Sequence, residues 1–307
     1  MDRALYWTHF ERYSKCPQMF LWYHGWRGVD VGGGFGKKKP LPTRRSEHDL
    51  LMGTVTQASL ERFYNDELWK NPKGYLDHME RLTETIFDQE LNRRYIDWEL
   101  SPTKEEMLKV CMDGVLGYLK TTMKRHKLLG PYARSEVEML GWIKGRALVA
   151  CRIDFIIRDR QEVVSILEGK NSKYKGKYID RDQIRWAALC YWLSWRRLPD
   201  RLGYDYWRFP TGYMADGLSE PEDGIEWVPF TTDDIKAVSA RALRTWYAMN
   251  DKNFQATPKP QHCRFCDYVT LCSERADQRS LNAAQRRSGD DDLVITPGGF
   301  VELDLDD

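Results

Sequence analysis

Two acidic residues and one lysine interrupt apolar stretches in the middle of the 307-residue chain. Asp154 stands within residues 152–157, which are otherwise mostly apolar, and Glu168-Gly169-Lys170 begins fourteen residues after it. Because side chains alternate along a β-strand, Glu168 and Lys170 would share one face of theirs. If the two stretches pair as a hairpin, Asp154 can lie beside them. Two carboxylates and an ammonium group would then converge at the edge of a sheet.

This grouping suits hydrolysis of a phosphodiester bond with a divalent metal. Mg²⁺ and Mn²⁺ prefer oxygen ligands, which Asp154 and Glu168 would supply. A bound metal lowers the pKa of water, delivers hydroxide to phosphorus and screens the charge of the transition state. Lys170 would orient that water and stabilise the developing charge. A salt bridge between Glu168 and Lys170 at a strand edge is the purely structural alternative.

Two helical segments on either side carry further polar candidates. Downstream, Gln183 and Tyr191 are eight residues apart, which is about 80° around a helix, so they share a broad face. Upstream, Gln57 and Glu61 lie one turn apart in the helix expected over His48–Asn65. Both segments could contribute to one site with the acidic pair.

The order of these motifs resembles the RecB-like exonuclease branch of the PD-(D/E)XK nuclease superfamily. That family has a helix with G-x-x-x-H-x-x-L-E, a strand with G-x-I-D, a strand with E-x-K, and a helix with a Gln and a Tyr. The resemblance implies an Mg²⁺- or Mn²⁺-dependent deoxyribonuclease, with exonuclease action on single-stranded DNA or DNA ends. It assigns metal binding to Asp154, Glu168, Gln57 and Glu61, and catalytic roles to Asp154, Glu168, Lys170, Gln183 and Tyr191.

The chain departs from this family pattern at two positions. Gln57 stands where the family usually has His, and an amide oxygen binds a hard cation more weakly than imidazole binds a transition metal. Tyr191 falls one helical turn later than usual, where this chain has Ala187 at the expected place. The first departure keeps an alternative open: a catalytically weakened DNA-binding subunit of a repair or recombination complex.

Seven cysteines in a chain without an export signal do not indicate a disulfide framework. Three of them lie in apolar contexts typical of small core residues. The other four are Cys16 near the beginning of the chain and a C-x2-C-x5-C cluster near its end, formed by Cys263, Cys266 and Cys272. Three cysteines cannot complete a four-cysteine site, and Cys16 is the obvious fourth.

This layout is similar to the iron–sulfur members of the RecB-like branch, the CRISPR-adaptation and AddB-type nucleases. They have one cysteine before the nuclease core and three after it. The resemblance implies a [4Fe–4S] cluster with a structural role. Zn²⁺, bound by the four cysteines or with His262 in place of Cys16, is the alternative. By loop-closure arithmetic, joining positions 16 and 263 could stabilise the fold by up to ~5 kcal/mol.

A basic run follows the Glu168-x-Lys170 motif, and aromatic residues are interleaved with it. Cationic side chains neutralise phosphates and aromatic faces stack on unpaired bases, so the run suits a single strand of DNA. A solvated loop and helix is the alternative. The candidate DNA contacts are Lys173, Lys175, Lys177, Arg181 and Arg185.

The pattern of elements predicts an α/β protein: a restriction-endonuclease-like mixed sheet flanked by helices, with a helical insertion and an iron–sulfur lobe. Strands are expected over Glu136–Ile143, Ala147–Arg158, Val163–Lys170 and Leu202–Phe209. Helical spacing marks residues 5–26, 48–65, 75–95, 104–127, 180–197 and 232–250. A single nuclease domain is expected over 1–275, with 1–47 and 251–275 as the cluster lobe and 66–130 as the insertion.

Composition limits the other possibilities. No apolar run approaches the ~20 residues of a membrane span, and no secretory signal is recognised, so a cytoplasmic location is expected. Residues 32–39 lack the spacing of a phosphate-binding loop, which excludes a motor ATPase. Residues 276–307 are expected to be an acidic, disordered tail, which leaves a basic body suited to DNA. A helicase, a recombinase or a CRISPR-adaptation protein would be a compatible partner.

Overall fold

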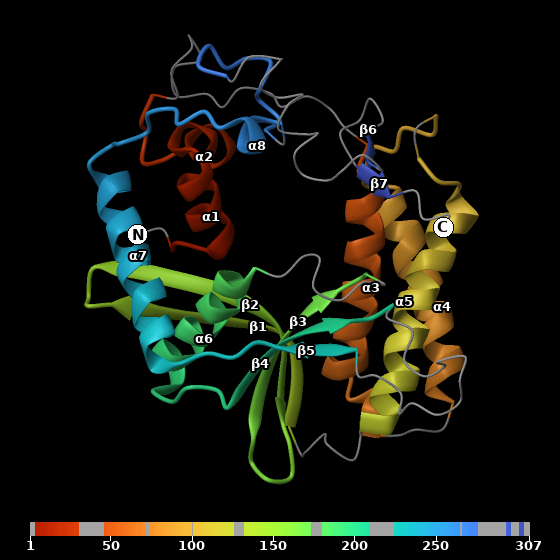
Figure 1. Cartoon of the computed structure of the whole chain (residues 1–307). Coiled ribbons are helices and arrows are strands. Elements are labelled where there is room, and N and C mark those ends of the chain that lie inside the picture. Colours follow the sequence, from red (N-terminus) through yellow and green to blue (C-terminus); the bar gives the residue numbers. More distant parts are fainter. Residues whose placement is uncertain are drawn as a thin grey trace. The chain divides into compact units, whose positions relative to one another are not determined.

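The computed structural model describes residues 4–30, 46–70, 74–99, 101–125, 132–172, 180–208, 224–264, 266–275, 293–295 and 301–303. The chain divides into two compact units (Figure 1). The first comprises Met1–Ala4 and Glu47–Ser239, and the second comprises Leu5–Ser46 and Ala240–Asp307. Each unit joins segments that are distant in the sequence.

The first unit is built on a five-stranded sheet with strand order β1-β2-β3-β4-β5. β1 to β3 form an antiparallel meander, β3 and β4 are parallel, and β5 pairs antiparallel with β4. The mixed sheet and the meander confirm the sequence-based prediction. The strands are β1 (Tyr132–Ile143), β2 (Ala147–Arg158), β3 (Val164–Lys170), β4 (Arg201–Tyr206) and β5 (Ile225–Trp227).

Local sequence explains how this sheet is connected. At the β1–β2 turn, Lys144 and Gly145 both have positive φ, the conformation that tight hairpin turns demand. The parallel pair needs a longer crossover, and helix α6 (Arg181–Trp195) provides it between β3 and β4. Asp180 caps this helix by accepting hydrogen bonds from the backbone N–H groups of Asp182 and Gln183.

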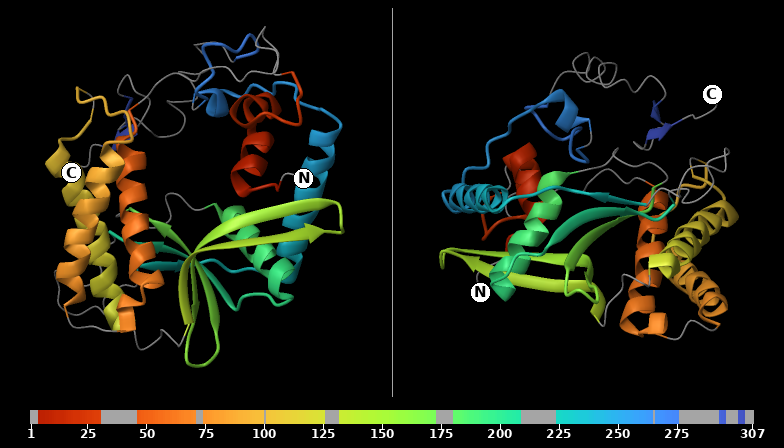
Figure 2. Two further views of the ribbon diagram at one scale, coloured as in Figure 1. Left: turned by 180° about the vertical axis from the view of Figure 1, so that it is seen from behind. Right: turned by 60° about the horizontal axis from the view of Figure 1, so that its bottom comes forward.

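Three long helices pack against one another beside the sheet (Figures 1 and 2). They are α3 (His48–Asn65), α4 (Tyr75–Leu91) and α5 (Lys104–Arg125), with the short 3-10 helix η1 (Leu68–Lys70) after α3. α4 ends four residues before the predicted end at 95, where the N–H groups of Arg93 and Arg94 bond to carbonyls only three residues back, those of Glu90 and Leu91. The core that these helices share with the sheet contains Tyr64, Tyr118, Phe155 and Trp207.

The second unit begins with two helices where residues 5–26 were expected to be helical throughout. α1 (Trp7–Lys15) and α2 (Pro17–His24) are separated by Cys16, whose backbone is extended at φ −163° and ψ 116°. The residue before a proline is pushed away from the helical region, and Pro17 then starts α2 as its first residue. The unit also contains α8 (Pro260–Cys263), β6 (Leu293–Ile295) and β7 (Val301–Leu303), and the helix α7 (Thr232–Asn250) has residues in both units.

Other sequence-based boundaries need adjustment. β1 begins at Tyr132, four residues earlier than predicted, and the three-residue β5 was not expected. Residues 31–45 and most of the predicted acidic tail lie outside the described residues. Within that tail, β6 and β7 pair with each other. Among the residues described here, no helix is long and apolar enough to cross a membrane.

Candidate functional site

β2 and β3 bring the central acidic pair together. The pairing of Phe155 with Leu167 places Asp154 beside the strand that carries Glu168. The N–H of Gly169 donates to Asp154 Oδ2 at 2.8 Å, and Lys170 Nζ lies 3.0 Å from Glu168 Oε1. Two carboxylates and one ammonium group thus share one end of the β2–β3 pair.

The surroundings of Asp154 disfavour the charged form of its carboxyl group. Burial of its carboxyl group and the negative charge of Glu168 raise its pKa well above the usual range, and Glu136 adds to that effect. The hydrogen bond from Gly169 and the charge of Lys170 act in the opposite direction but do not cancel the rise. A carboxylate held among other carboxylates is ionised more easily when a cation is bound beside it.

Helix α6 contributes Gln183 to the same group. Its Nε2 donates to Glu168 Oε1 at 2.6 Å, the oxygen that Lys170 also contacts. Both contacts fall on Oε1, so neither of them uses the second oxygen of Glu168. The lysine is supported in turn by the ring of Tyr204 on β4, whose centroid lies 5.4 Å from Nζ.

Gln57 and Glu61 of α3 gather around a residue that the sequence did not single out, Glu136 of β1. Gln57 Nε2 donates to Glu136 Oε1 at 2.6 Å, and Arg152 Nε lies 3.4 Å from Glu136 Oε2. Burial, and next the charge of Glu136, raise the pKa of Glu61. Because Glu136 also raises the pKa of Asp154, it connects the α3 residues electrostatically to the β2–β3 pair.

Only the pairing of the first two strands could have revealed Glu136 in advance. The register joins Ser135 to Phe155 and Val137 to Ile153, so Glu136 stands opposite Asp154. No motif marks this residue, and the predicted strand merely begins with it.

The structure places Tyr191 at a distance from Gln183 along α6. They are eight positions apart, which corresponds to about 12 Å along the helix. The buried Tyr191 ring stacks on Trp195 with a centroid distance of 6.1 Å. Packing thus accounts for Tyr191, and its proposed part in catalysis stays a prediction.

The candidate DNA contacts fall into three groups. Lys173, Lys175 and Lys177 lie outside the described residues. Arg181 is exposed at the beginning of α6. Arg185 is partly buried and forms ion pairs with Asp234 of α7 at 2.9 Å and with Asp182 at 3.6 Å. Of the two arginines, Arg181 is therefore the one available to a phosphate.

Comparison with known proteins decides what this arrangement belongs to. The sequence matches the family described as "PD-(D/E)XK nuclease superfamily" over residues 7–273. The chain belongs to this superfamily. Members of this superfamily are nucleases, and Asp154, Glu168 and Lys170 are of the residue types after which it is named.

A solved structure is also similar to this PD-(D/E)XK chain. It is described as "Crystal structure of SSO0001" and is 15% identical, and the match covers 75% of this chain and 97% of that one at a TM-score of 0.33. So low a TM-score adds nothing to the assignment. No curated protein matches the chain.

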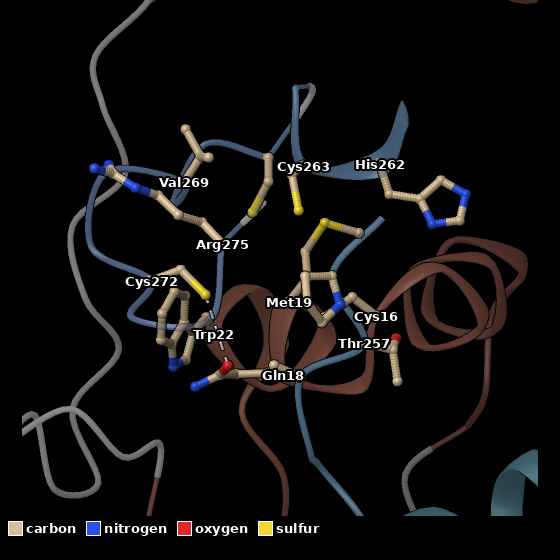
Figure 3. Close-up of a pocket in the computed structure, with 13 residues that line it drawn as sticks. Cys16, Gln18, Met19, Trp22, Thr257, His262, Cys263, Val269, Cys272 and Arg275 are labelled. Carbon is tan, nitrogen blue, oxygen red and sulfur yellow. Dashed lines mark hydrogen bonds between the residues drawn. The ribbon is translucent and has the colours of Figure 1, made fainter. Parts of the chain in front are cut away.

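The second unit contains a pocket lined by all four of the cysteines that the sequence grouped together. Cys16 comes from the junction of α1 and α2, and Cys263, Cys266 and Cys272 come from α8 and the segment after it (Figure 3). Cys111, Cys151 and Cys190 are buried elsewhere, as expected of core residues. Segments that are almost 250 residues apart thus converge on one group of thiols.

Neighbouring thiols of the pocket raise the pKa values of Cys266 and Cys272. Burial raises the pKa of Cys266 to about 11, and the charges of Cys16 and Cys272 contribute to the rise. Burial and the charges of Cys16 and Cys263 likewise raise the pKa of Cys272. Thiols in such a group ionise together only when a cationic centre compensates them.

Neither site, as far as the structure describes it, forms a compact set of ligands for a bare ion. Within the described parts of the chain, no group of three or more His, Cys, Asp or Glu side chains could hold a single metal ion. The His262 ring also contacts the carbonyl of Lys15, 3.1 Å from its Nδ1, and points away from the sulfur of Cys263 (Figure 3). The zinc site with His262 in place of Cys16 gains no support from this geometry.

Proposed function

We propose that the chain is a metal-dependent DNA nuclease of the RecB-like branch, with exonuclease action on single-stranded DNA or DNA ends. The observation that carries the proposal is the convergence of Asp154, Glu168 and Lys170, closed by the 2.6 Å hydrogen bond from Gln183 to Glu168. Membership of the PD-(D/E)XK superfamily supports the nuclease activity, while the substrate and the exonuclease mode rest on the motif order.

The donor set suits Mg²⁺ or Mn²⁺. Hard divalent ions bind carboxylate oxygens, and Mg²⁺ keeps several waters, so one or two carboxylates plus the phosphate of the substrate suffice. Such a site needs no set of three acidic ligands around one ion, and the described residues contain no such set. The raised pKa of Asp154 points the same way, because a cation beside it relieves the repulsion from Glu168.

The residues of the chain then have distinct tasks. Asp154 and Glu168 would hold the metal, which supplies an activated water and screens the charge that develops on phosphorus. Gln183 and Lys170 both bond to Oε1 of Glu168, so they would fix the carboxylate while Oε2 serves as the metal ligand. The ammonium group of Lys170 would also stabilise the phosphate oxygens of the transition state.

The cysteine pocket is proposed to hold a [4Fe–4S] cluster that ties residues 1–47 to 251–275 as a lobe of the nuclease domain. Four thiols that line one pocket suit a cluster, since four cysteine thiolates are the usual ligands of a [4Fe–4S] centre. The proposed role is structural.

Incubation of anaerobically purified protein with single-stranded DNA and Mg²⁺ or Mn²⁺ tests the proposal. Cleavage should occur in wild type and disappear in Asp154→Ala, while DNA binding survives. A visible spectrum with a broad shoulder would indicate iron–sulfur in the same preparation. A folded, coloured protein that binds DNA but cleaves nothing with either ion would contradict the nuclease activity.

That last outcome would favour a second candidate, a DNA-binding subunit with weakened catalysis. The observation behind it is Gln57, which stands where the family usually has His and is bound to Glu136. In that case the chain would bind DNA ends or recruit a partner such as a helicase, a recombinase or a CRISPR-adaptation protein.

A further inference from the structure

We propose that Glu136 is a positioning residue of the metal site: it holds the amide of Gln57 so that the amide oxygen is left to face the cation. The inference rests on the proposed metal-dependent nuclease and concerns how this particular chain completes its site. It starts from one contact, the 2.6 Å hydrogen bond that Gln57 Nε2 donates to Glu136 Oε1.

Both oxygens of Glu136 are already engaged. Oε1 accepts the hydrogen bond from Gln57, and Oε2 lies 3.4 Å from Nε of Arg152. The Glu136 side chain is only 13% exposed, whereas Arg152 is 69% exposed. A carboxylate held from both sides is suited to orienting a neighbour rather than to binding a metal itself. This agrees with the absence, among the described residues, of three acidic side chains that could hold one ion.

The contact dictates which end of the Gln57 side chain remains available. An ionised carboxylate accepts hydrogen bonds and cannot donate them, so the amide nitrogen must face Glu136. The carbonyl oxygen is then the remaining polar atom of the side chain, and amide oxygens are ligands of hard cations. Residues that orient a metal ligand in this way change metal affinity by about 10- to 100-fold when they are removed.

The backbone of Glu136 carries a second sign of function. Its φ is +55°, in the left-handed region that non-glycine residues seldom adopt, although it lies within a β-strand and opposite Asp154. Such conformations persist where the surrounding structure enforces them, and they concentrate at functional sites. If only the backbone shape mattered, glycine would fill this position with less strain.

Equilibrium binding of Mn²⁺ to the full chain tests the inference without relying on cleavage. Glu136→Gly removes the side chain but suits the positive φ, so its melting temperature should not fall below that of wild type. We expect its affinity for Mn²⁺ to drop about 10-fold or more. Glu136→Gln, whose side-chain oxygen can still accept from Gln57, should restore most of the affinity. Glu138→Gln, an exposed neighbour on the same strand, is the matched control and should bind Mn²⁺ as wild type does.

A double-mutant cycle decides whether Glu136 acts through Gln57. In a Gln57→Ala background, Glu136→Gly should cause little further loss of Mn²⁺ affinity. Additive losses, an unchanged affinity in Glu136→Gly, or a loss accompanied by a lower melting temperature would overturn the inference.

The outcome for the proposed nuclease activity can be separated from this one. Wild type that binds Mn²⁺ with the expected coupling but does not cleave DNA would refute the nuclease and leave the role of Glu136 standing. If wild type cleaves DNA and Glu136→Gly changes neither cleavage nor Mn²⁺ binding, the nuclease activity stands and the role of Glu136 is refuted. Wild type that binds no Mn²⁺ would overturn both.

Discussion

The backbone N–H of Gly169 donates a hydrogen bond to Oδ2 of Asp154 at 2.8 Å. This bond links the central residue of the Glu168-Gly169-Lys170 motif to the acid on the neighbouring strand. It fixes the separation of the two carboxylates without using either Glu168 or Lys170, which remain free to contact each other. The geometry of the acidic pair therefore depends on the backbone as much as on the side chains.

Asp154→Asn should abolish DNA cleavage and at the same time stabilise the metal-free protein near neutral pH. The pKa of Asp154 is raised, so folding favours its neutral form, and stability is lost as pH rises through that pKa. Asparagine stays neutral and can still accept the hydrogen bond from Gly169. We expect cleavage to fall by about a hundredfold or more.

Thermal denaturation with and without Mn²⁺ checks this prediction. In EDTA the variant should melt above wild type at neutral pH, and the difference should shrink as pH falls toward the range where wild-type Asp154 is protonated. Added Mn²⁺ should stabilise wild type, by ~2.7 kcal/mol at a hundred times the dissociation constant, but not the variant. Equal melting temperatures at every pH would show that repulsion within the acidic pair is unimportant.

Gly169→Ala should destabilise the protein although it adds only one methyl group. A Cβ at position 169 would lie 1.9 Å from a ring carbon of Trp207, which is buried in the shared core. Overpacking of this kind costs about 1–3 kcal/mol. Gly53→Ala is the matched control: it stands in the interior of α3, and in the described part of the chain no atom outside its own helical turn lies within 4 Å of the added Cβ. There alanine should stabilise the helix by ~0.5–1 kcal/mol. Chemical denaturation of both variants measures the difference.

The proximity of Asp154, Glu168 and Lys170 could be predicted from sequence because its determinants are local. Alternation within β3 placed Glu168 and Lys170 on one face, and a short connection made the β2–β3 hairpin the simplest pairing for Asp154. Glu136 could not be found in this way, since its place depends on the exact register between β1 and β2 and on an unusual φ. The ion pair of Arg185 with Asp234 joins residues almost fifty positions apart, so composition alone could not distinguish Arg185 from a DNA contact.

Boundaries were predicted less well where no local signal marks the end of an element. α4 ends at Leu91, and residues 92–95 contain neither glycine nor proline to indicate it. By contrast, the break between α1 and α2 follows from Cys16-Pro17 itself, because proline restricts the residue before it. All four cysteines that the sequence grouped together line one pocket, and the cluster that they would hold stays a prediction.

Cys266→Ala should remove the iron and weaken the second unit. If the four cysteines hold a cluster that links residues 16 and 263, its loss should cost up to ~5 kcal/mol of stability. Iron content, the visible spectrum and the melting temperature should all fall together. Cys111→Ala is the control, since Cys111 is buried in the helical core of the first unit and does not line the pocket. It should lose stability through the cavity it leaves but keep its iron. A Cys266→Ala protein that retained iron, fold and nuclease activity would rule out the structural cluster.

Arg181→Ala should weaken DNA binding, whereas Arg185→Ala should lower the stability of the protein. Arg181 is exposed at the start of α6, so its loss should weaken binding of single-stranded DNA and reduce the slope of log K against log salt by ~0.7 per phosphate contact. Arg185 bonds to Asp234 at 2.9 Å and is only 19% exposed, so its removal would break this ion pair between α6 and α7. We expect a lower stability for Arg185→Ala, with the salt slope unchanged. Fluorescence titrations at several salt concentrations, paired with urea denaturation, separate the two. A reduced salt slope in Arg185→Ala would mean that the arginine leaves Asp234 when DNA binds.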